Sequence, residues 1–149
     1  MLAYSPVADW IAGRLVDAPP RLRTFRALQQ SRLKLAIGIA VAWLLGGFLE
    51  EAALRGIVLA SVEGVLASPL GEMVATAAAV LVAALAAAVL HAYQGPRAMI
   101  IIGQLSVLFG VLYAMSGPNL WTVILCHGLY DTVAFARFAN KSSKYSRLD

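Results

Sequence analysis

The chain has 149 residues, of which 60% are hydrophobic and only 13% are charged, and its formal net charge is +4. Soluble globular domains carry about 25% charged residues, so a soluble fold of this length could not cover so much apolar surface. The length allows one domain. The basic residues flank apolar segments, a pattern that is typical of membrane proteins. We therefore do not interpret the positive net charge as a nucleic-acid-binding surface. We therefore predict an all-α, multi-pass integral membrane protein.

The first 33 residues are polar and basic and are interrupted by Pro19 and Pro20. We predict that residues 1–33 form a partly helical segment at the cytoplasmic surface of the bilayer, where the basic side chains meet anionic lipid. Residues 34–138 then form the transmembrane core. Residues 139–149 form a basic cytoplasmic tail.

The core contains apolar segments for about four transmembrane helices. The apolar run before Glu50 is too short to cross the roughly 30 Å hydrocarbon layer, which needs about 20 residues. We therefore predict one long, tilted helix with an acidic pair near its middle, although a re-entrant segment after the first helix is an alternative. The predicted elements are a first helix at 35–62, a turn at 63–72 and further spans at 73–92, 98–116 and 120–137.

The basic residues are distributed unevenly between the two sides of the predicted bundle. Four spans place the segments that carry them on one side, and the 63–72 connection, whose only charged residues are Glu63 and Glu72, on the other. The positive-inside rule then places both termini in the cytoplasm. The basic residues on the cytoplasmic side are Arg14, Arg21, Arg23, Arg26, Arg32 and Lys34 before the first span, Arg97 in a loop, and Arg137, Lys141, Lys144 and Arg147 after the last span.

Ionisable side chains at membrane depth are the main functional signal. Such residues are rare because burying them in hydrocarbon is costly, and by default they indicate a functional site. Both histidines of the chain are among them. The candidate site residues are Glu50, Glu51, Arg55, His91, His127 and Asp131.

The spacing of these residues predicts two local pairs. Glu51 and Arg55 are four residues apart and face the same side of a helix, so we predict a structural ion pair. Glu50 gains no such partner and is available as a general base. His127 and Asp131 are also four residues apart.

His91 comes from a separate helix. Together with His127 and Asp131, it could hold Zn²⁺ and an activated water. The simpler alternative for either histidine alone is a hydrogen bond between helices, which is common in membrane bundles.

Three sequence motifs resemble those of the CPBP intramembrane proteases, the CAAX-protease and Abi group related to the type II CAAX prenyl endopeptidase. Residues 50–56 (EEAALRG) match the EExxxR motif, residues 91–95 (HAYQG) resemble the second motif, and residues 127–131 (HGLYD) fit HxxxN/D. The resemblance covers residues 35–137. One departure is Ala87, where the family usually has Phe four residues before the histidine.

This resemblance implies an intramembrane endopeptidase that hydrolyses a peptide or protein substrate at the membrane. It implies that Glu50 is the general base and that His91 assists it. His127 and Asp131 would bind a metal, for which Zn²⁺ is the candidate, or stabilise the oxyanion, and the ion pair of Glu51 with Arg55 would hold its helix in place. The alternatives are a catalytically inactive scaffold or bacteriocin-immunity-type protein, and a small proton-coupled or metal transporter, because intramembrane Glu and His also act as relays.

Overall fold

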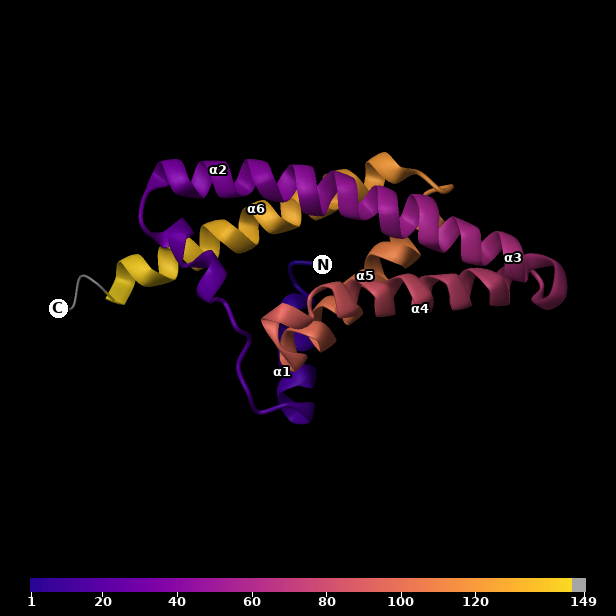
Figure 1. Cartoon of the computed structure of the whole chain (residues 1–149), viewed down its shortest axis with the longest axis horizontal. Helices are drawn as coiled ribbons and strands as arrows, with labels where there is room; N and C mark the ends of the chain where they lie inside the picture. Colours follow the sequence, from indigo (N-terminus) through magenta and orange to yellow (C-terminus); the bar gives the residue numbers. More distant parts are fainter. Residues whose placement is uncertain (146–149) are drawn as a thin grey trace.

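The computed structural model describes residues 1–145, and within that range every regular element is a helix (Figure 1). The predicted all-α membrane fold is thereby confirmed. The elements are α1 (Ser5–Leu15), η1 (Arg23–Gln29), α2 (Arg32–Ala42), η2 (Trp43–Glu50), η3 (Ala52–Leu59), α3 (Ala60–Leu70), α4 (Glu72–Leu90), η4 (Ala92–Gln94), α5 (Pro96–Met115) and α6 (Leu120–Tyr145).

Four of these elements, α2, η2, η3 and α3, join into one continuous helix of 39 residues. At about 1.5 Å per residue it is about 58 Å long, which exceeds the roughly 30 Å hydrocarbon layer. The prediction of a long first helix is confirmed, but the predicted turn at 63–72 is wrong. Pro69 lies inside the last turns of α3, and Gly71 alone reverses the chain with a positive φ of 79°. Glycine adopts this conformation without the steric cost that a Cβ imposes.

The middle of this helix is π-helical on both sides of Glu51. π-Helical turns are rare and often occur at functional sites. This stretch also crosses α6 closely, because a Cβ on Gly47 would lie only 3.4 Å from the carbonyl oxygen of Ile124. The crossing is fixed by Trp43, whose indole Nε1 donates a hydrogen bond of 3.0 Å to Thr132 Oγ1. Small residues therefore bring the acidic motif next to α6.

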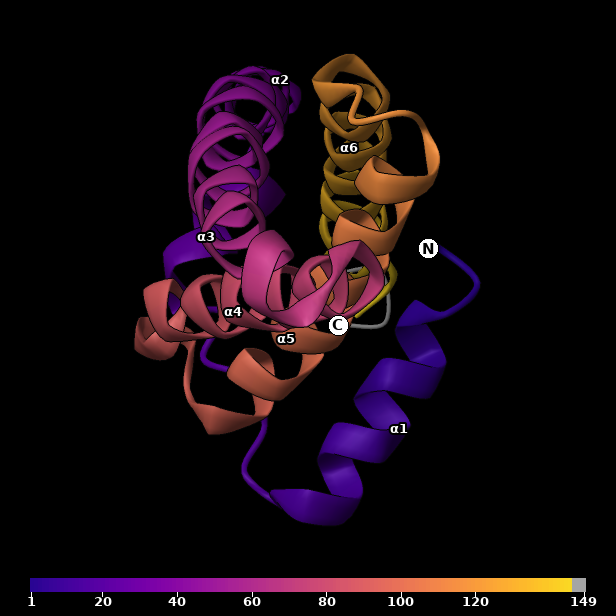
Figure 2. The same cartoon turned by 90° about the vertical axis from the view of Figure 1, so that its right-hand side faces the viewer.

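Helices α4 and α5 form a hairpin beside the long helix (Figure 2). Along α4, buried alanines recur every four residues and make a face of small side chains on which neighbouring helices pack. These alanines are Ala75, Ala79, Ala83 and Ala87. Among the described residues, the long helix, α4 and α5 are long and apolar enough to cross a membrane. The structure confirms a helix at the fourth predicted span, but its crossing of the membrane stays a prediction.

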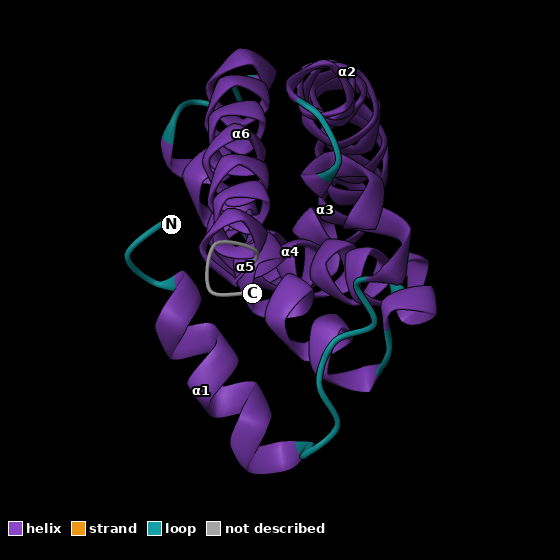
Figure 3. Cartoon of the chain, turned by 90° about the vertical axis from the view of Figure 1, so that its left-hand side faces the viewer, coloured by secondary structure: helices purple, strands orange, loops and turns teal. Residues whose placement is uncertain are grey.

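The N-terminal helix α1 packs on α5 (Figure 3). Arg97 on α5 forms an ion pair of 2.8 Å with Asp9, and Tyr4 donates a hydrogen bond of 2.9 Å to Gln104. The placement of residues 1–33 at a membrane surface stays a prediction. Of the predicted tail, α6 extends to Tyr145, whereas residues 146–149 lie outside the described part of the chain.

Candidate functional site

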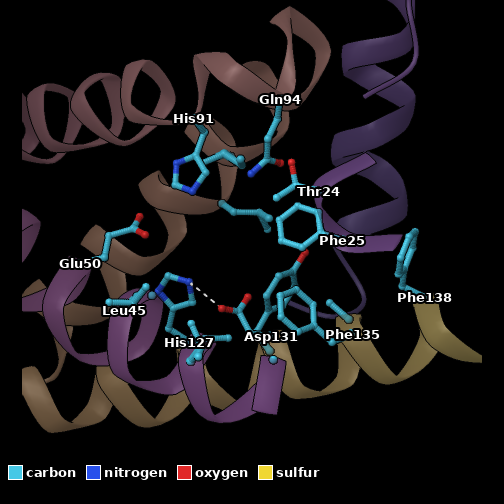
Figure 4. Close-up of a pocket in the computed structure, with 18 of the residues that line it drawn as sticks. Thr24, Phe25, Leu45, Glu50, His91, Gln94, His127, Asp131, Phe135 and Phe138 are labelled. Carbon is cyan, nitrogen blue, oxygen red and sulfur yellow. Dashed lines mark ion pairs between the residues drawn. The ribbon is translucent and has the colours of Figure 1, made fainter. Parts of the chain in front are cut away.

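A cavity of about 720 Å³ lies between η2, the α4–α5 connection, α6 and η1. It is lined by five of the six predicted site residues, which come from three separate parts of the chain, namely Glu50, Arg55, His91, His127 and Asp131. Figure 4 labels four of them, Glu50, His91, His127 and Asp131. The long first helix thus carries Glu50 into the same cavity as His91, as a shared site requires.

Glu51 does not line this cavity but is fully buried behind it. Its Oε1 accepts hydrogen bonds from Arg55 Nη1 at 3.1 Å and from His127 Nδ1 at 2.6 Å. The first contact confirms the predicted ion pair. The second joins the long helix to α6, and no local pattern predicts it because the two residues lie far apart in the chain. Glu51 therefore orients the His127 ring as well as neutralising Arg55.

Arg55 is held by α5 as well as by its ion pair. Its Nη2 donates to both the carbonyl oxygen and the Oγ of Ser106, each at 2.7 Å. Its guanidinium also lies 5.7 Å from the ring centroid of Phe109. Charge-assisted hydrogen bonds of this kind fix geometry strongly in a buried site. Sequence reasoning missed Ser106, since a lone serine in an apolar helix carries no distinctive pattern.

The His127 ring is held by contacts with its face and with both of its nitrogen atoms. It stacks on Phe109 with centroids 4.7 Å apart, and its Nδ1 is bonded to Glu51. Its Nε2 faces Asp131, with 3.6 Å between Nε2 and Oδ2. The four-residue spacing therefore brings the two side chains together on one face of α6, although the separation exceeds a hydrogen bond. A small polar group could bind both atoms at once.

Gly46 borders this pair from the long helix, one turn before Glu50. A Cβ at this position would lie 3.0 Å from Asp131 Oδ2 and 3.5 Å from His127 Nε2. Contacts of 3.0 Å are tighter than a side chain normally makes. The absent side chain therefore leaves the polar end of the cavity open.

Glu50 comes from η2 and His91 from the end of α4, and both line the same cavity (Figure 4). His91 follows the last residue of α4, and its Nδ1 donates to the carbonyl oxygen of Ala87 at 2.9 Å, which leaves Nε2 available. Ala87 is itself fully buried. Among the described side chains, none forms a hydrogen bond or an ion pair with Glu50. Its carboxylate is therefore available to water and substrate.

The positions of the possible metal ligands can be compared with the predicted zinc site. Within residues 1–145, no three side chains of His, Cys, Asp or Glu lie close enough together to hold a metal ion. A catalytic zinc normally has three protein ligands and one open position. His91, His127 and Asp131 line one cavity but do not converge in this way. In this arrangement they do not fit Zn²⁺, and zinc dependence stays a prediction for experiment.

Comparison with known proteins identifies the family. No curated protein and no solved structure matches the chain. The family model described as type II CAAX prenyl endopeptidase Rce1-like matches residues 32–133, which is more than half of the chain and includes all of the candidate site residues. This family consists of proteases that are integral to the membrane. The chain therefore belongs to the Rce1-like family of type II CAAX prenyl endopeptidases.

Proposed function

We propose that this chain is an active intramembrane endopeptidase and that Glu50 is its general base. The observation that supports this most directly is the environment of the two adjacent glutamates. Glu51 is buried and occupied by Arg55 and His127, whereas Glu50 faces the cavity with no partner among the described side chains. A general base must reach the attacking water, and only Glu50 of the two can do so.

In the proposed reaction, Glu50 takes a proton from a water molecule in the cavity, and His91 orients that water. The resulting hydroxide attacks the carbonyl carbon of the scissile peptide bond and forms a tetrahedral oxyanion. The carbon–nitrogen bond then breaks, and Glu50 returns the proton to the departing amine nitrogen. The products are a carboxylic acid and an amine, and Glu50 ends in its initial state. Transfer of the acid proton to the amine then gives a carboxylate and an ammonium group.

The oxyanion is held at the His127 end of the cavity. Because Nδ1 of His127 donates to Glu51, its Nε2 faces the cavity and donates to the oxyanion when the ring carries both protons. Asp131 lies beside Nε2 and supports that charged form of the ring. Glu51 and Arg55 act as positioning residues in this mechanism, because Glu51 bonds to His127 and Arg55 bonds to Glu51.

We place the peptide substrate in the membrane or at its surface, with both termini of the chain in the cytoplasm. The cavity is formed partly by the connection between α4 and α5 and by η1. Both segments lie next to the basic residues that the positive-inside rule assigns to the cytoplasmic side. Substrate would therefore enter from the cytoplasmic half of the bilayer.

The test compares the wild type with Glu50→Gln and with Glu72→Gln as a matched control. Glu72 is an exposed carboxylate at the start of α4, outside the cavity. Each protein is purified in detergent and incubated with a library of quenched fluorescent peptides, with and without a chelator. Thermal unfolding is followed for all three proteins to confirm that they are folded.

Cleavage by the wild type and by Glu72→Gln, but not by folded Glu50→Gln, is the expected result. Loss of cleavage with the chelator would support a metal requirement, and rescue by Zn²⁺ would identify the ion. Cleavage by folded Glu50→Gln at the wild-type rate would overturn the role of Glu50. Absence of cleavage by every protein would favour an inactive scaffold.

A further inference from the structure

The N-terminal segment forms one wall of the candidate active-site cavity. Side chains from η1 and its flanking residue line the cavity, namely Leu22, Thr24, Phe25 and Leu28. The sequence prediction treated residues 1–33 as separate from the protease core, and in this respect it is incomplete. All four of these residues lie outside residues 32–133, which match the family. Its contribution is therefore a property of this chain's own N-terminal segment.

We call residues 21–30 the strap, because this segment crosses the cavity and is hydrogen-bonded to the rest of the protein near both of its ends. At one end the backbone N–H of Arg21 donates to the carbonyl oxygen of Gln94 at 2.8 Å, in the connection after α4. At the other end Gln29 Nε2 donates to the carbonyl oxygen of Phe138 at 3.2 Å, on α6. The strap therefore spans from the His91 side of the cavity to α6.

Apolar packing holds the middle of the strap in place. Leu28 is 8% exposed and occupies the space left by Gly38, where a Cβ would lie 2.2 Å from Leu28 Cδ2. The ring of Phe25 packs against Phe135 of α6, with centroids 5.5 Å apart and planes inclined by 49°. Aromatic pairs in this range contribute beyond their buried area. The strap is thus a packed wall and not a loosely attached tail.

The cavity has a polar end and an aromatic end (Figure 4). Glu50, His91 and His127 lie at the polar end. Phe25 lies on the opposite side, with the aromatic side chains of Phe135 and Phe138 near it. A peptide bond at the polar end would therefore place a neighbouring side chain against the Phe25 ring.

We propose that Phe25 is a specificity-determining residue, which forms the end wall of a subsite for a large apolar side chain next to the scissile bond. This inference rests on the proposed function of the site. Apolar walls favour apolar groups because burial removes their surface from water. A rigid aromatic ring also limits the size of the group, since protein interiors tolerate little overpacking.

The substitution Phe25→Ala removes the end wall and should deepen the subsite. Binding of peptides with the largest side chains, such as Trp, should improve relative to those with Leu. Changes of a few methylene groups in an apolar pocket change discrimination by about 10–200-fold. We expect the preference for Trp over Leu to rise by at least about tenfold. Arg26→Ala is the matched control, because Arg26 lies on the same strap, is exposed and does not line the cavity.

The experiment measures binding and hydrolysis separately, so that the two proposals can fail independently. Binding is measured by isothermal titration with the Glu50→Gln protein, with and without Phe25→Ala or Arg26→Ala. The probes are short peptides that differ at one scanned position, which carries Ala, Leu, Phe or Trp. Hydrolysis of the same peptides is measured with Glu50 restored, as kcat/KM.

A shift toward Trp with Phe25→Ala, and none with Arg26→Ala, would support the subsite even if no peptide were cleaved. Equal preferences in both variants, or a general loss of binding to all peptides alike, would overturn the subsite. Failure of every peptide to bind would also overturn it. Cleavage that depends on Glu50 but is indifferent to Phe25 would leave the proposed function standing and remove only this inference.

Discussion

The buried ion pair between Arg55 and Glu51 allows a sharp test of the structure. Arg55 is 1% exposed and Glu51 is 0% exposed, so neither charge can regain solvent when its partner is removed. Replacing Arg55 with Met keeps much of the side-chain volume but removes the positive charge and three hydrogen bonds. Leaving a buried charge without its partner costs about 3–5 kcal/mol. We therefore expect Arg55→Met to lower the free energy of unfolding by this amount.

Arg97→Met is the matched control, because Arg97 forms its ion pair with Asp9, which is 51% exposed. Exposed pairs contribute about 0–1 kcal/mol. The double variant Glu51→Gln/Arg55→Met removes both buried charges and should regain much of the lost stability. The assay is denaturant unfolding in detergent micelles, followed by circular dichroism. If Arg55→Met cost no more than Arg97→Met, or if the double variant were the least stable, the structure of this buried pair would be wrong.

Two further substitutions test the shape and the support of the site. Gly46→Ala should lower peptidase activity without unfolding the protein, because its Cβ would lie 3.0 Å from Asp131 Oδ2 and would displace that carboxylate. In the control Gly64→Ala a Cβ meets nothing within 4 Å, so this variant should keep activity and gain about 0.5–1 kcal/mol in unfolding free energy. Ser106→Ala should cost about 1–3 kcal/mol in unfolding free energy, because it removes one of the buried hydrogen bonds of Arg55. Ser106→Thr keeps the hydroxyl and should lie closer to the wild type, and equal losses in the two variants would contradict a role for the hydroxyl.

Local features of the site could be predicted from the sequence, whereas contacts between helices could not. The pairing of Glu51 with Arg55 follows from a four-residue spacing, which any helix places on one face. The bond between Glu51 and His127 depends on where the long helix crosses α6, and no spacing encodes that. The predicted turn at 63–72 failed because a proline and two glycines there suggested a loop. In the structure Gly71 alone was sufficient to end the helix.

The strap was missed for a different reason. Residues 21–30 have no hydrophobic periodicity and no motif, so composition alone assigned them to a surface segment. Their position is set by a few specific contacts, such as the seating of Leu28 on Gly38. Such contacts depend on the shape of the assembled bundle, and a single glycine in a helix does not reveal what will pack on it.

The adjacent glutamates show how a membrane protein can combine a costly buried charge with a reactive one. Two carboxylates on neighbouring residues of a helix point in different directions, so their environments can differ completely. Glu51 points into the bundle, where Arg55 and His127 satisfy its Oε1. Glu50 points into the cavity. Environment and not residue type then separates the supporting carboxylate from the proposed general base. Exchange of the two environments would require a rotation of the long helix, and the contacts of Glu51 on α6 oppose that rotation.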